Sequence, residues 1–267
     1  MKIILTAIVL LSSLQYAHAD ISLNFSGLPI NDDNPAYIYS IKGQQLKFTA
    51  PTEGNTSLYD AEKEEFISLE QKSGKRSMLN KQRLQLRVNQ LNIERLKTLT
   101  EVEEKLRKEL VTMNTAQQHA AETLLNAFKY PEFYGEHTSL IVKPMKKSKV
   151  VNSLNCTVYQ LYKITDLLKT FCFADAKDLK FSEREYKTLR SFYAFNYYMQ
   201  SQILIAMGNT KFSLIDFDQH EMSGVLIEEI SYQKSARPPA KIAFHSQLKK
   251  VDYTPLKEAD FSLDKAP

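Results

Sequence analysis

The chain has 267 residues, of which 43% are hydrophobic, and a formal net charge of +4 at pH 7. A chain of this length can bury a large core, and its hydrophobic content is that of an ordinary globular protein. The small excess of basic residues is spread along the chain and does not form a basic stripe, which argues against nucleic acid as a partner. We therefore expect one large globular domain that binds no nucleic acid.

Residues 1–19 have the pattern of a cleaved signal peptide. Lys2 precedes an apolar run from Ile3 to Leu11, and Ala17 and Ala19 are the small residues that a signal peptidase requires. A membrane anchor needs roughly 20 apolar residues, about twice the length of this run. We therefore expect cleavage before Asp20, a location in the bacterial periplasm or outside the cell, and no transmembrane span in the mature chain.

The first part of the expected domain, residues 20–73, is typical of β structure. Polar and apolar residues alternate in "QQLKFTA", and Gly43, Pro51 and Gly54 separate the runs. The pattern predicts an antiparallel meander with one solvated face. It begins a single domain that we place at residues 20–267.

A helical insertion is expected at about residues 76–129. Residues 75–130 contain neither glycine nor proline, and apolar residues recur at spacings of three and four. We expect one long helix, a break near Asn114 and Thr115, and a second helix that ends before Pro131.

The chain has two cysteines, Cys156 and Cys172, in segments rich in residues that favour strands. A metal or redox site is the alternative, but the spacing matches neither a zinc site nor a Cys-x-x-Cys pair. In an oxidising compartment, cysteines this close tend to form a disulfide. An even separation would place both sulfur atoms on one face of a hairpin. Because the midpoint, Ile164, precedes the best turn residues, we also expect a bulge.

A third helix follows the cysteine hairpin and is expected to run from Ser182 to Met207. Ser182 and Glu185 have the spacing of a capping box, and Gly208 is a suitable stop. Two last strands, at about residues 223–233 and 241–253, complete the expected sheet. The predicted fold class is α+β: a curved antiparallel β-sheet, or half-barrel, packed on helices.

Three segments together resemble a family of bacterial periplasmic proteins known only as a domain of unknown function. They are "SLYDAEKEEFISLE", "VVNSLNCTVYQL" and "FCFADAKDLKFSEREYKTL". The resemblance implies a half-barrel similar to that of the periplasmic lipoprotein carriers (LolA-like), with an apolar concave face. It implies no catalytic residues.

No pattern in the sequence predicts catalytic residues, a cofactor or a metal. The strongest metal candidate is "DFDQHE", where Asp216, Asp218, His220 and Glu221 offer oxygen and imidazole ligands. We favour the alternative, a solvated turn between two elements. No serine lies in a Gly-x-Ser-x-Gly elbow, so the sequence does not indicate a hydrolase.

The aromatic stripe of the third expected helix, Ser182 to Met207, is the best candidate for a binding site. Tyr193 and Tyr197 could line the mouth of an apolar groove, because a tyrosine ring packs while its hydroxyl stays in water. The sequence therefore favours a non-enzymatic periplasmic carrier that holds an apolar ligand or a lipidated partner. The alternative is a structural or interaction protein of the cell envelope, in which the helical insertion binds a partner or self-associates. The sequence does not determine the oligomeric state.

Overall fold

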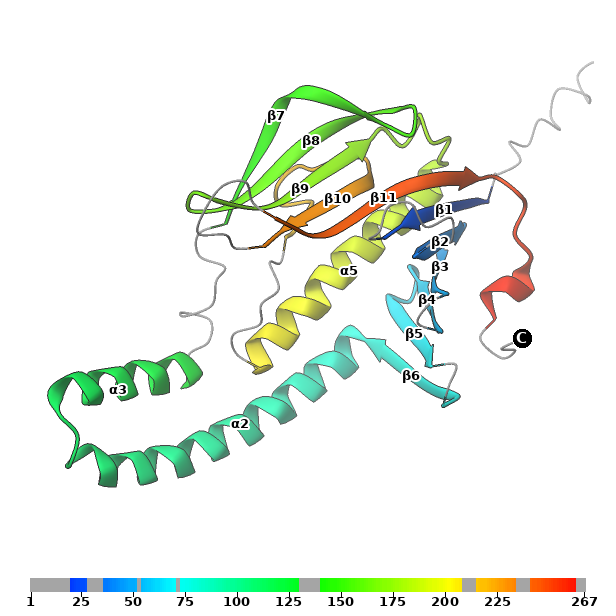
Figure 1. The fold of residues 1–267 in the computed structure, drawn as a ribbon. Coiled ribbons are helices and arrows are strands. Elements are labelled where there is room, and N and C mark those ends of the chain that lie inside the picture. Colours follow the sequence, from blue (N-terminus) through cyan, green and yellow to red (C-terminus); the bar gives the residue numbers. More distant parts are fainter. Residues whose placement is uncertain are drawn as a thin grey trace, which may run out of the picture.

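A computed structural model describes residues 20–27, 36–51, 54–70, 73–129, 140–207, 215–233 and 241–262 (Figure 1). The predicted signal peptide, residues 1–19, lies outside the described residues. The strands are β1 (Ile21–Ser26), β2 (Tyr37–Lys42), β3 (Gln45–Ala50), β4 (Asn55–Asp60), β5 (Glu65–Glu70), β6 (Lys75–Asn80), β7 (Leu140–Val151), β8 (Leu154–Lys163), β9 (Asp166–Ala174), β10 (Val225–Tyr232) and β11 (Ile242–Asp252). The helices are α2 (Lys81–Leu110), α3 (Thr115–Lys129), α5 (Glu183–Met207) and the short 3-10 helix η2 (Glu258–Phe261).

The described strands form one sheet of 11 strands in the order β6-β5-β4-β3-β2-β1-β11-β10-β9-β8-β7. Every neighbouring pair is antiparallel. Two meanders, β1–β6 and β7–β11, are joined where the first strand pairs with the last, for example Leu23 with Val251. The sheet is curved and open, so the predicted fold class, an α+β half-barrel, is confirmed.

Helix α5 lies along the inside of this curve and supplies the centre of the core (Figure 1). Leu189, Phe192 and Phe195 are buried and belong to the same cluster as Leu23 and Tyr59 of the sheet. The predicted capping box is present at the start of the helix. The Ser182 backbone N–H donates to the Glu185 carboxylate (2.9 Å), and the Glu185 backbone N–H donates to the Ser182 hydroxyl (3.2 Å).

The helical insertion forms a hairpin of α2 and α3 that extends away from the sheet (Figure 1). We call it the helical arm. The predicted break near Asn114 is present, whereas the helical part begins at Lys81 and not at about residue 76. Residues 76–80 belong to strand β6, which pairs with β5 along its whole length. The helix starts only after Asn80, whose side chain accepts a hydrogen bond from the Arg83 backbone N–H (2.9 Å).

Candidate functional site

Cys156 in β8 and Cys172 in β9 form a disulfide, with their Cα atoms 5.4 Å apart. In the register of the two strands, Cys156 lies opposite Ala174 and Val158 lies opposite Cys172. The two cysteines are thus diagonal neighbours on one face of the hairpin. Both are almost completely buried, so the bond joins the strands inside the protein and is not presented to solvent.

The predicted bulge is what brings the two sulfur atoms to the same face. The hairpin turn consists of Ile164 and Thr165, and Ile164 adopts a positive φ of 58°. With this turn alone, Cys156 would lie opposite Phe173, and the sulfur atoms would point to opposite faces. The register shifts by one residue between Leu161 and Tyr162, and Cys156 then lies opposite Ala174.

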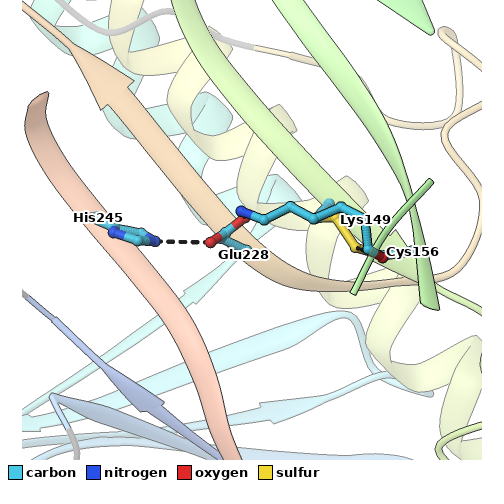
Figure 2. Close-up of a disulfide and its surroundings, with 5 residues drawn as sticks. Lys149, Cys156, Glu228 and His245 are labelled. Atoms are coloured by element: carbon cyan, nitrogen blue, oxygen red, sulfur yellow. Dashed lines mark hydrogen bonds and ion pairs between the residues drawn. A yellow bond between two sulfur atoms is a disulfide. The ribbon is translucent and has the colours of Figure 1, made fainter. Parts of the chain in front are cut away.

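A buried carboxylate lies beside the disulfide. The Glu228 side chain in β10 is only 2% exposed, and it forms an ion pair with Lys149 of β7. Its other oxygen is 3.0 Å from the Nε2 atom of His245 in β11. Figure 2 shows Lys149 and His245 approaching Glu228 from opposite sides. The Nδ1 atom of His245 has no hydrogen-bond partner among the described residues. The Lys149 ammonium compensates the charge of this buried carboxylate.

The predicted groove residues Tyr193 and Tyr197 line one hollow between α5 and the sheet. Its volume is about 170 Å³. Its other lining residues are Tyr39, Lys169, Phe171, Phe192, Asn196, Gln200, Ile215, Phe217, Leu226 and Glu229. The hollow therefore combines aromatic walls with an ion pair, in which the Lys169 ammonium lies 2.7 Å from the Glu229 carboxylate.

The two tyrosines occupy different depths of this hollow. Tyr193 packs edge-on against Phe217, with the ring centroids 5.4 Å apart, and burial raises the pKa of its phenol far above the ordinary value. Burial also raises the pKa of Tyr197, one turn further along α5, with a smaller contribution from the charge of Asp216. Tyr193 thus contributes to the core as well as to the wall of the hollow.

A second hollow of about 600 Å³ lies at the beginning of α5. Its lining residues are Thr157, Phe173, Ala174, Asp175, Ala176, Lys177, Phe181, Ser182, Glu183, Tyr186, Ser223 and Gly224. Phe217 lines the first hollow, and its ring also contacts a residue that lines the second. Its centroid is 5.2 Å from that of Phe173 in the second hollow and 5.8 Å from that of Phe171 in the first.

Phe217 belongs to the segment that the sequence presented as a metal candidate or a turn. The Asp216 carboxylate accepts hydrogen bonds from the backbone N–H groups of Asp218 (3.0 Å) and Gln219 (3.2 Å). Arg190 of α5 forms an ion pair with Asp218 and donates to the Met222 carbonyl (2.7 Å). Within the described residues, no group of three or more histidine, cysteine or acidic side chains could hold a metal ion. Through these contacts with Arg190, the turn that contains Phe217 is held against α5.

Sequence reasoning missed Phe217 and Glu228. Phe217 stands between two aspartates, and its local pattern is that of a solvated turn. Glu228 is one of two adjacent glutamates in β10, and alternation shows only that they face opposite ways. A buried glutamate next to a half-buried one has no signal of its own in the sequence.

The helical arm presents large apolar side chains to solvent. The exposed set on α2 and just beyond it consists of Leu86, Leu91, Ile93, Leu96, Val102 and Val111. Only Leu84, Val88 and Leu99 of α2 are buried, and the first two pack near Tyr198 and Met199 of α5. Among the helices that the structure describes, none is long and apolar enough to cross a membrane.

No protein family model matches the chain, and no curated protein matches it.

Proposed function

We propose that this protein is a non-enzymatic carrier that holds an apolar ligand, or the lipid of a lipidated partner, between α5 and the curved sheet. The observation that supports the proposal is the pair of hollows beside α5, each of which has a lining residue in contact with the Phe217 ring. Drug-sized ligands occupy pockets of roughly 300 to 1,000 Å³. The hollow at Tyr193 and Tyr197 is smaller than this, and the second hollow lies within the range.

The ligand would enter the second hollow and extend toward the first as Phe217 moves aside. The Phe217 segment contacts α5 through the Arg190–Asp218 ion pair and through the ring contact of Phe217 with Tyr193. The segment lies between α5 and β10 and belongs to no strand, so it can move without breaking the hydrogen bonds of the sheet. The Lys169–Glu229 pair would then meet the polar end of an amphiphile. Such a ligand has an apolar chain and a small polar group, as a fatty acid does.

Binding of a fluorescent fatty acid tests the proposal. Tyr197→Ala should weaken binding, whereas Tyr198→Ala should not, because Tyr198 faces the arm and its hydroxyl donates to Gln85 (3.4 Å). The two variants carry the same truncation at neighbouring positions of one helix. Phe217→Ala should strengthen binding by joining the hollows. If the wild-type protein binds no probe, or if the two tyrosine variants bind it equally, the carrier proposal is wrong.

The second candidate function is an interaction protein that uses the helical arm. The exposed apolar residues of α2 favour it, because solvent-exposed patches of this kind often mark protein interfaces. Native mass spectrometry of the protein from its own envelope separates the two candidates. Co-purified lipid supports the carrier, and a stable dimer without lipid supports the arm as the interface. Leu86→Ser combined with Ile93→Ser should then return the dimer to monomer.

We also propose the periplasm, or the outside of a bacterial cell, as the location, and membership in the family of unknown function with the LolA-like half-barrel. The motifs quoted above and the signal-peptide pattern support both proposals. The paired cysteines are compatible with an extracellular location. Fractionation of cells that express the full chain, with and without residues 1–19, tests the location. The protein should leave the cytoplasm only when these residues are present.

A further inference from the structure

The β7–β8 hairpin, residues 140–163, has a local excess of positive charge. It contains Lys143, Lys146, Lys147, Lys149 and Lys163, and no aspartate or glutamate. The whole chain has a net charge of only +4, because acidic residues elsewhere in the chain balance these lysines, and the expectation that the basic residues are spread evenly is wrong for this hairpin. Glu228 neutralises Lys149. Lys146 and Lys147 are exposed and lie in an irregular part of the edge strand.

The geometry of β7 prevents another strand from extending the sheet at this edge. The register with β8 breaks between Pro144 and Ser148, so the three residues between them lie outside the ladder. Pro144 also has no backbone N–H to donate to a further strand. Lysines and prolines on an edge strand are established means of preventing strand addition. A partner of this edge must therefore recognise its side chains and not its backbone.

Exposed apolar side chains alternate with the lysines. Ile141, Met145 and Val150 are between 42% and 63% exposed. The Lys143 ammonium lies over the ring of Tyr162, 5.0 Å from its centroid. Lysine stems lie along apolar surfaces while their charges reach polar surroundings, and tyrosine is enriched at membrane–water interfaces. Nucleic-acid sites favour arginine, and this hairpin contains none.

We propose that the β7–β8 hairpin docks the protein on an anionic lipid surface. The lysines at positions 143, 146 and 147 would face the lipid phosphates, while Met145 enters the headgroup region. This surface lies at the edge of the sheet, whereas the hollows lie against α5, so the inference does not depend on the carrier function.

Co-sedimentation with phosphatidylcholine vesicles, with and without phosphatidylglycerol, tests the inference. The protein should bind only the vesicles that contain phosphatidylglycerol. Binding should disappear at about 1 M salt, where the screening length falls to about 3 Å. Replacing Lys143, Lys146 and Lys147 together with glutamine should weaken binding by on the order of tenfold or more, because each lysine contributes separately at an anionic surface.

A control variant with the same change of net charge carries glutamine at Lys97, Lys105 and Lys249, which are exposed elsewhere. This variant should bind the vesicles nearly as the wild type does. Met145→Ser should weaken vesicle binding and leave binding of soluble polyphosphate unchanged. The inference is overturned if the wild type ignores the anionic vesicles, or if both triple variants lose affinity equally. It is also overturned if Met145→Ser has no effect on vesicle binding, which would indicate a soluble polyanion as the ligand.

Discussion

Cys172 and Glu228 lie directly opposite each other on the neighbouring strands β9 and β10. The disulfide and the buried carboxylate therefore share one face of the sheet, and both connect β7 or β8 to the strands further in (Figure 2). One connection is covalent and the other electrostatic. Because the two are adjacent, the loss of either one should affect this half of the sheet and not the β1–β6 meander.

Removing the disulfide should lower stability without abolishing the fold. Replacing Cys156 and Cys172 together with alanine should cost about 3 kcal/mol, because the unfolded chain gains conformational freedom. The free energy of unfolding, measured in denaturant, checks this expectation. The native wild-type protein should also resist alkylation until it is reduced and unfolded. Rapid alkylation of the native protein without reductant would contradict the pairing.

The ion pair of Lys149 with Glu228 should contribute measurably to stability. Lys149→Met removes the charge that compensates Glu228 and should cost about 1 to 3 kcal/mol. Lys146→Met makes the same change three residues away, at an exposed position, and should stay within about 0.5 kcal/mol of the wild type. Equal costs for both variants would show that the ion pair is not what stabilises this face. Adding Glu228→Leu to Lys149→Met should recover part of the loss, since no buried charge then remains unpaired.

Phe192 and Tyr197 should differ sharply in their effect on stability. Phe192 is buried, and its ring contacts those of Tyr39 and Tyr59 at 5.8 and 5.6 Å. Phe192→Ala should therefore cost about 3 to 5 kcal/mol, as large truncations in a core do. Tyr197→Ala should cost much less, because that side chain is only partly buried. Thermal unfolding of the two variants gives the comparison. Equal losses of stability would show that the aromatic stripe of α5 belongs only to the core.

The protein should lose stability at alkaline pH through buried tyrosines. Burial raises the phenol pKa values of Tyr37, Tyr39 and Tyr193 well above the ordinary value of about 10. The unfolded chain releases these protons near pH 10, whereas the folded protein keeps them. Stability is therefore complete below about pH 10 and falls above it. Tyr193→Phe should move the alkaline unfolding midpoint upward, and Tyr198→Phe should leave it unchanged. If all tyrosines ionise before unfolding, as followed by phenolate absorbance, the expectation is wrong.

Limited proteolysis should cut the helical arm first. The break between α2 and α3 contains Val111, which is 85% exposed, and a segment with few buried contacts opens locally at low cost. A nonspecific protease at low concentration should cleave near residues 111–114 while the β strands stay intact. Mass spectrometry of the fragments locates the cut. Earlier cleavage within Leu154–Ala174 would show that the cysteine hairpin is the less stable part.

The sequence by itself determined the features that depend on neighbouring residues. The helices follow from spacings of three and four without glycine or proline, and the start of α5 follows from Ser182 and Glu185. The disulfide follows from two cysteines close together in a hairpin, with the bulge that the position of Ile164 predicts. These patterns are readable because the interacting groups are close along the chain.

Only the tertiary structure decided that residues 76–80 form a strand, that Phe217 lines a hollow and that Glu228 is buried. Residues 76–80 combine three polar residues with Met78 and Leu79 and lack a clear period, and they become a strand because β5 offers a complete ladder. Phe217 becomes part of a wall through ring contacts with β9 and α5, and its segment is held by Arg190, which is 28 residues from its partner Asp218. Glu228 is compensated by Lys149, 79 residues away. Contacts across such separations depend on how the sheet curves, and local propensity contains no information about that curve.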